Sequence, residues 1–68
     1  MEFGKRFKKF RLDNNLTQLQ VANRIGIAQT NISNWENDTT RPEYENLIKL
    51  AKIYDVTTDE LLGVEDKK

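Results

Sequence analysis

Apolar residues recur along this chain every three or four positions, the spacing that places them on one face of an α-helix. Phe3, Phe7 and Phe10 form the first such stripe. The helix that carries it is expected to end near Asn14–Asn15, because asparagine tolerates the left-handed backbone conformation that follows many helices. No stretch of strand length alternates between apolar and polar residues. The pattern therefore predicts an all-α fold, a compact bundle of five short helices.

Two threonines mark the starts of further helices. Thr17–Gln20 and Thr57–Glu60 both have the form of a capping box, in which a hydroxyl residue is followed three positions later by Gln or Glu. Gly26 and Gly63 are the expected ends of the helices that these boxes begin. The apolar residues expected to face the core from the second and fourth helices are Val21, Ala22, Ile25, Leu47, Leu50, Ala51 and Tyr54.

A third helix is expected to begin at about Ala28 or Gln29, two or three residues after Gly26. The loop NDTTRP follows it, and Pro42 sets the start of the fourth helix. Two short helices joined by an abrupt glycine turn are typical of the helix-turn-helix, here about residues 17–37. The predicted domain is residues 1–63, and residues 64–68 are interpreted as a flexible tail or the start of a linker.

The third helix has an unusual outer face. At about 100° per residue, Ala28, Ile32 and Trp35 turn inward. The polar residues that point outward or lie at the shoulders are Gln29, Thr30, Asn31, Ser33, Asn34 and Asn37. Most are poor helix formers, but amides and hydroxyls can match the donors and acceptors of base edges in the major groove. The alternative is a face that is simply solvated.

The distribution of charge bears on whether the chain binds DNA. The net charge is zero, but residues 1–35 hold six bases against two acids and residues 36–68 hold five against nine. This segregation suggests one basic and one acidic surface. A neutral chain lacks the strongly basic balance that is usual for nucleic-acid binders. A protein-interaction module on the same fold, without DNA binding, is therefore the alternative function.

Several motifs together resemble the Cro/C1-type helix-turn-helix family of phage and bacterial repressors, lambda repressor-like proteins of the XRE family. The matching features lie between residues 3 and 62: Arg11, Leu16-Thr17-Gln18, Ala22, Gly26, Ile32-Ser33-x-Trp35-Glu36, Pro42, Leu47-x-x-Leu50-Ala51 and Asp59-x-Leu61-Leu62. The resemblance implies a bundle of five helices whose third helix reads double-stranded DNA in the major groove. It also implies a transcriptional regulator, most often a repressor, that binds a palindromic operator as a homodimer.

The resemblance also assigns roles to residues. The residues implied to contact bases are Gln29, Thr30, Ser33 and Asn34, and those implied to contact phosphates are Gln18, Asn37, Thr39, Thr40 and Arg41. Arg11 and Glu36 are implied to form a structural ion pair between the first and third helices. The expected dimer contact involves Tyr54, Val56, Thr58 and Leu61.

Two departures from the family pattern affect these expectations. Ala28 stands where many relatives have a hydroxyl residue as the N-cap of the recognition helix, so that helix is expected to begin weakly. Asp38 stands in place of a usual glycine and adds a negative charge near the expected phosphates.

Other function classes are disfavoured by composition. The chain has no cysteine and no histidine, and it carries no glycine-rich phosphate loop. We therefore expect no metal, no cofactor, no small-molecule ligand and no enzymatic activity. No apolar run approaches the length of about 20 residues that a membrane span needs, and no signal peptide is evident. A cytoplasmic protein of bacterial or phage origin is expected.

Overall fold

The computed structural model describes residues 3–64, and these residues form five helices and no strand. The helices are α1 (Gly4–Asp13), α2 (Gln18–Ile25), α3 (Gln29–Glu36), α4 (Tyr44–Ile53) and α5 (Thr58–Leu62). The predicted all-α fold is confirmed. Within the described range, no helix is long and apolar enough to cross a membrane. Of the predicted tail, only Val64 lies inside the described residues.

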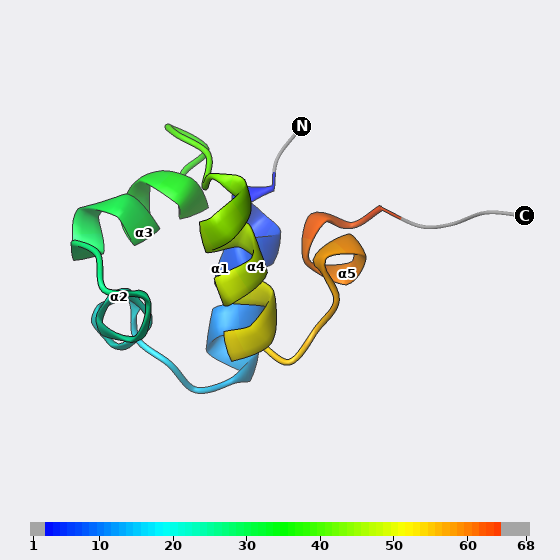
Figure 1. Ribbon diagram of the computed structural model, residues 1–68, viewed down its shortest axis with the longest axis horizontal. Coiled ribbons are helices and arrows are strands. Elements are labelled where there is room, and N and C mark those ends of the chain that lie inside the picture. The colour runs from blue at the N-terminus through cyan, green and yellow to red at the C-terminus, as the bar shows by residue number, and fades with distance from the viewer. Residues whose placement is uncertain (1–2, 65–68) are drawn as a thin grey trace, which may run out of the picture.

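The helices are arranged with α2 and α3 at one end, α5 at the other, and α1 and α4 between them (Figure 1). α3 packs against both α1 and α2, and α4 packs against α2 and α5. α5 also contacts α1. The two helices of the helix-turn-helix are therefore supported from behind by α1 and α4, and one face of α3 is left uncovered.

The ends of the helices follow the local signals in the sequence. Both predicted capping boxes form: the hydroxyl of Thr17 accepts the N–H of Gln20, and that of Thr57 accepts the N–H of Glu60. Gly26 ends α2 at φ +88°, and Gly63 ends α5 at φ +75°. Asn15, just after α1, also lies in the left-handed region at φ +58°. These residues supply the turns without the steric cost that most side chains would add.

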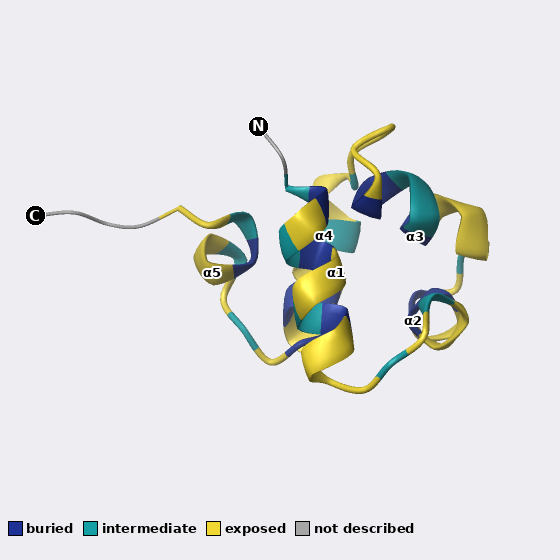
Figure 2. Cartoon of the chain, turned by 180° about the vertical axis from the view of Figure 1, so that it is seen from behind, coloured by how far each residue is buried: buried dark blue, intermediate teal, exposed yellow. Residues whose placement is uncertain are grey.

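The core draws residues from every helix. Its buried apolar members are Phe7, Val21, Ala22, Ile25, Ile32, Trp35, Leu50, Ala51, Tyr54 and Leu61. Phe3 and Phe10, which belong to the same apolar stripe as the buried Phe7, are only partly buried and pack against the edge of the core. Figure 2 shows the buried surface of the helices facing the interior, whereas the N-terminal end of α3 is exposed. Trp35, with 5% of its surface exposed, is a core residue, as the helical spacing predicted.

The predicted dimer contact was wrong for two of its four residues. Only 3% of the surface of Tyr54 and none of that of Leu61 is exposed, because α5 packs against α1 and α4 and both side chains lie in the core that these helices share. Neither side chain can meet a second molecule without leaving the core. Val56 and Thr58 are half-buried, and their part in a dimer stays a prediction.

Candidate nucleic-acid interface

The outer face of α3 presents uncharged polar side chains. Gln29 and Thr30 are exposed at the start of the helix, and Ser33 and Asn34 are partly exposed one turn later. The only charged residue of α3 is Glu36, and its side chain is buried. The uncovered face therefore offers hydroxyl and amide groups, donors and acceptors together, without a carboxylate that would repel phosphate.

The start of α3 has no side-chain cap. Ala28 occupies the N-cap with an extended backbone and makes no capping hydrogen bond from its side chain, as the sequence indicated. The first turn of the recognition helix therefore keeps backbone N–H groups that need another partner.

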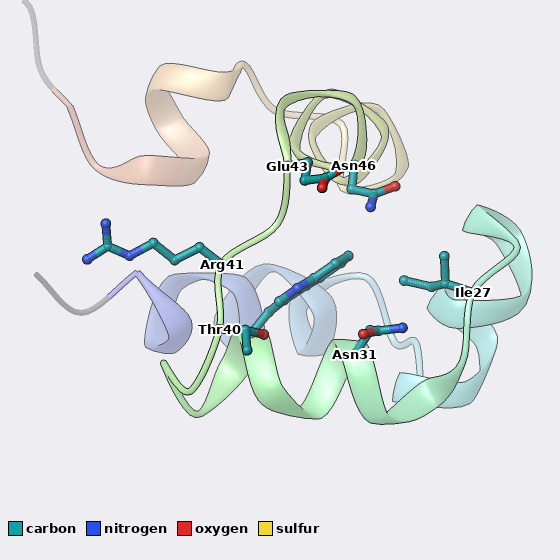
Figure 3. Close-up of a pocket in the computed structure, with 7 residues that line it drawn as sticks. Ile27, Asn31, Thr40, Arg41, Glu43 and Asn46 are labelled. Carbon is teal, nitrogen blue, oxygen red and sulfur yellow. The ribbon is translucent and has the colours of Figure 1, made fainter.

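Asn31 lies on the shoulder of α3 that faces α4. It lines a groove of about 320 Å³ together with Ile27, Trp35 and Asn46. In Figure 3 the side chains of Asn31 and Asn46 approach this groove from α3 and α4. Asn31 therefore stands apart from the outward-facing residues, and the sequence had left its direction open.

Arg11 of α1 and Glu36 of α3 form the expected ion pair, which is buried between these two helices. Arg11 donates from Nε to Oε2 of Glu36 at 2.6 Å and from Nη2 to Oε1 at 3.0 Å. The side chains are 9% and 3% exposed. A third donor, Nη1, reaches the carbonyl of Leu16 at 2.9 Å. The side-chain hydrogen bonds with Glu36 raise the pKa of Arg11 above its ordinary value, so the guanidinium stays charged although it is buried.

Gln18 connects this ion pair to Gln29 at the start of α3. Its amide nitrogen donates to Oε1 of Glu36 at 3.1 Å, and its amide oxygen accepts from Nε2 of Gln29 at 3.4 Å. The sequence predicted a phosphate contact for Gln18 and did not predict this link. Because an amide nitrogen carries two hydrogens, one N–H of Gln18 is still available to an anion. Gln29 is thus tied through Gln18 to a buried charge pair.

The loop after α3 carries the other residues expected to contact phosphate. Asn37, Thr39, Thr40 and Arg41 are all exposed. The backbone N–H of Thr39 donates to the carbonyl of Asn34 at 2.9 Å. This hydrogen bond makes the loop turn immediately after the C-terminal end of α3. The four predicted phosphate-contacting residues of this loop therefore follow the predicted base-contacting residues of α3 closely along the chain.

Asp38 has a role that the sequence did not indicate. Its backbone lies in the left-handed region at φ +61°, and its side-chain Oδ1 accepts the N–H of Gly4 at 3.0 Å. The carboxylate therefore caps the start of α1, where Phe3 supplies no side-chain cap of its own. No local sequence pattern reveals a bond between residues 34 positions apart.

A helix-turn-helix domain family matches residues 4–67, which is nearly the whole sequence. The chain belongs to the helix-turn-helix family. Its matching motifs and its lambda repressor-like arrangement of helices identify it as a Cro/C1-type member.

Two curated relatives illustrate the similarity. The chain is 39% identical over 66 residues to the HTH-type transcriptional regulator ImmR of Bacillus subtilis strain 168, with 97% of this chain and 52% of ImmR covered. It is also 39% identical over 66 residues to the HTH-type transcriptional activator BcrR of Enterococcus faecalis, which it covers to 32%. The chain thus spans about half or less of the length of these helix-turn-helix regulators.

A solved structure extends the comparison to three dimensions. The P22 c2 repressor, crystallised in complex with a synthetic operator, superposes with a TM-score of 0.86 at 29% sequence identity. The match covers 96% of this chain and 98% of that one. The helix-turn-helix domain described here therefore has the fold of a protein that was solved on operator DNA.

Proposed function

We propose that this chain is the DNA-binding domain of a transcriptional regulator that recognises a specific double-stranded sequence through the major groove. The observation that carries the proposal is the uncharged ridge of α3, which comprises Gln29, Thr30, Ser33 and Asn34 and faces away from the core. Groups of this kind pair with base edges, and amides can form two hydrogen bonds with adenine. The resemblance to the P22 c2 repressor supports the same assignment.

Binding of the backbone is assigned to residues on either side of this ridge. In the proposal, Gln18 contacts one phosphate from the start of α2, and Asn37, Thr39, Thr40 and Arg41 contact another from the loop after α3. Such contacts fix the position of the protein on the duplex, whereas the ridge distinguishes sequences. The negative charge of Asp38 is compatible with this role, because its carboxylate is bonded to the start of α1.

The regulator is proposed to act as a homodimer on a palindromic operator with half-sites about one helical turn apart. A single helix reads only a few base pairs, so two copies give useful specificity. Val56 and Thr58 are the remaining proposed dimer contacts. We propose repression as the outcome, by analogy with the P22 c2 repressor, while BcrR is named an activator. The cytoplasm is the proposed location, and no catalytic role is assigned.

Selection of bound duplexes from a random pool, followed by a salt titration on the selected duplex, tests the proposal. A sequence-specific dimer should enrich a short half-site repeated with two-fold symmetry. The logarithm of its affinity should fall with the logarithm of salt concentration by about 0.9 for each phosphate contacted. Failure to enrich any sequence, with a flat response to salt, would instead favour a protein-interaction module, the alternative that the neutral net charge leaves open.

A further inference from the structure

The phosphate-binding loop, residues 37–41, is attached to the N-terminal turn of α1. Asp38 accepts the N–H of Gly4, as described above. Gly4 is itself buried against the end of α3, where a Cβ atom would overlap the backbone carbonyls of Glu36 and Trp35. Only glycine allows this close approach of the two backbones. The first turn of α1 and the loop after α3 are therefore held as one unit.

A second contact within this unit involves a side chain expected to bind DNA. The guanidinium of Arg41 lies over the ring of Phe3, with Cζ 5.8 Å from the ring centroid. Phe3 is half-buried and packs against the edge of the core, so its ring has a fixed support. Arg41 is otherwise exposed, and in Figure 3 its side chain extends away from the groove between α3 and α4.

This geometry suits an arginine that must bind a phosphate. An arginine on an exposed loop loses considerable side-chain entropy when it is fixed on a ligand. A cation–π contact uses the face of the guanidinium, so the N–H donors at its edge stay available for a phosphate oxygen. A ring that restrains Arg41 before binding reduces the entropy lost on binding.

We propose that Phe3 is a positioning residue that holds Arg41 ready for a phosphate of the DNA backbone. The inference rests on the proposed function, because it requires Arg41 to contact DNA. Phe3 lies outside the helix-turn-helix itself. This role would make the N-terminal turn of α1 part of the DNA-binding surface. The ring of Phe3 would act by contacting Arg41 and would not itself need to contact DNA.

Phe3→Leu tests this role, because leucine fills most of the same space but provides no aromatic face. Affinity for a mixed-sequence DNA duplex at low ionic strength should fall about two- to five-fold, the range typical of an exposed cation–π contact. Phe3→Tyr keeps the ring and should retain the affinity of the unsubstituted chain. Phe10→Leu is the matched control, since Phe10 is also half-buried on α1 but faces Arg6 and Lys9. It should leave binding unchanged.

The decisive readout is a double-mutant cycle. If Phe3 acts through Arg41, Phe3→Leu should have no effect on affinity in a chain that already carries Arg41→Ala. An equal loss in both backgrounds, or no loss in either, would overturn the role of Phe3 while leaving salt-dependent binding intact. If the unsubstituted chain shows no steep salt dependence, the proposed function fails and the role of Phe3 fails with it. Thermal melting of each variant shows whether a loss reflects unfolding.

Discussion

At the scale of single residues, the buried pair of Arg11 and Glu36 fixes α3 against α1 and is hydrogen-bonded through Gln18 to Gln29 on the outer face of α3. Arg11 bonds to Glu36 in a bidentate arrangement, and the same carboxylate accepts the amide of Gln18. The pair is buried, so loss of one partner leaves the other without compensation in a medium of low dielectric constant. The orientation of α3 relative to α1 therefore depends on two residues that are 25 positions apart in sequence.

We predict that Arg11→Ala lowers the free energy of unfolding by about 3 kcal/mol, as expected when a buried ion pair loses one partner. Urea denaturation followed by circular dichroism measures the change. Lys9→Ala is the control, because Lys9 and Asp13 form an exposed pair within α1 whose side chains are 64% and 55% exposed. That substitution should cost at most about 0.5 kcal/mol. Similar losses in the two variants would contradict a special role for the buried pair.

Tyr54 offers a second test at this scale. Its side-chain hydroxyl is buried without a hydrogen-bond partner among the described residues, and burial raises its pKa above the ordinary value. The phenol is protonated in both states at neutral pH. Above about pH 10, the pKa of an exposed tyrosine, the unfolded chain releases this proton before the folded chain does. The unfolded state then binds fewer protons, so this contribution to stability is lost as the pH rises.

We therefore predict that Tyr54→Phe reduces the loss of stability above about pH 10. At neutral pH the variant should be as stable as the unsubstituted chain, or more stable by about 1 kcal/mol, since a buried unpaired hydroxyl is removed. Chemical denaturation at a series of pH values gives both quantities. Tyr44→Phe is the matched control, because Tyr44 is 86% exposed. An unchanged alkaline profile in Tyr54→Phe would contradict this account.

At the scale of helices, local chemistry made most of the fold predictable. The capping boxes at Thr17 and Thr57 and the glycines at positions 26 and 63 act within a few residues, so the sequence displays them directly. The helical spacing of Ile32 and Trp35 likewise separated the buried face of α3 from its outer face. Apart from the Arg11–Glu36 pair, which the family resemblance implied, contacts between distant segments were not predictable, because no local pattern encodes them. The bond between Asp38 and Gly4 and the contact between Arg41 and Phe3 are examples.

The burial of two residues predicted for the dimer contact, Tyr54 and Leu61, was missed for a related reason. The apolar stripe placed Tyr54 on the inner face of α4, but sequence alone did not show that α5 would pack against α1 and α4 and bury its own Leu61. The outer ridge was easier to predict, because a helix that is buried on one side must expose the other.

Gly4 gives a prediction at this scale. In an ordinary helix, glycine to alanine stabilises by about 1 kcal/mol. Gly4→Ala should instead destabilise the fold by about 1–3 kcal/mol, the cost of overpacking, because the added carbon overlaps the carbonyl of Glu36. Gly26→Ala meets no atom within 4 Å, but it places alanine at φ +88°, so its cost should come from the backbone alone. If Gly4→Ala raises the melting temperature, the close approach of α1 and α3 is wrong.

At the scale of the whole molecule, the fold separates support from recognition. α1 and α4 hold the helix-turn-helix from behind, α5 closes the far end of the core, and the outer face of α3 stays free (Figures 1 and 2). For DNA binding, the zero net charge of the chain matters less than the positions of its charged side chains. The outer face of α3 is uncharged, and the one carboxylate of this helix, that of the buried Glu36, is paired with Arg11. Such a surface suits sequence recognition, with phosphate contacts supplied by its neighbours.

The most direct test of this account compares Asn34→Ala with the unsubstituted chain on the selected duplex and on random duplexes. Direct base reading predicts a loss of about 1–3 kcal/mol on the selected site, relaxed preference at one base position and little change on random DNA. Equal losses on every duplex, or no loss on the selected site, would contradict the proposal that the outer face of α3 reads bases.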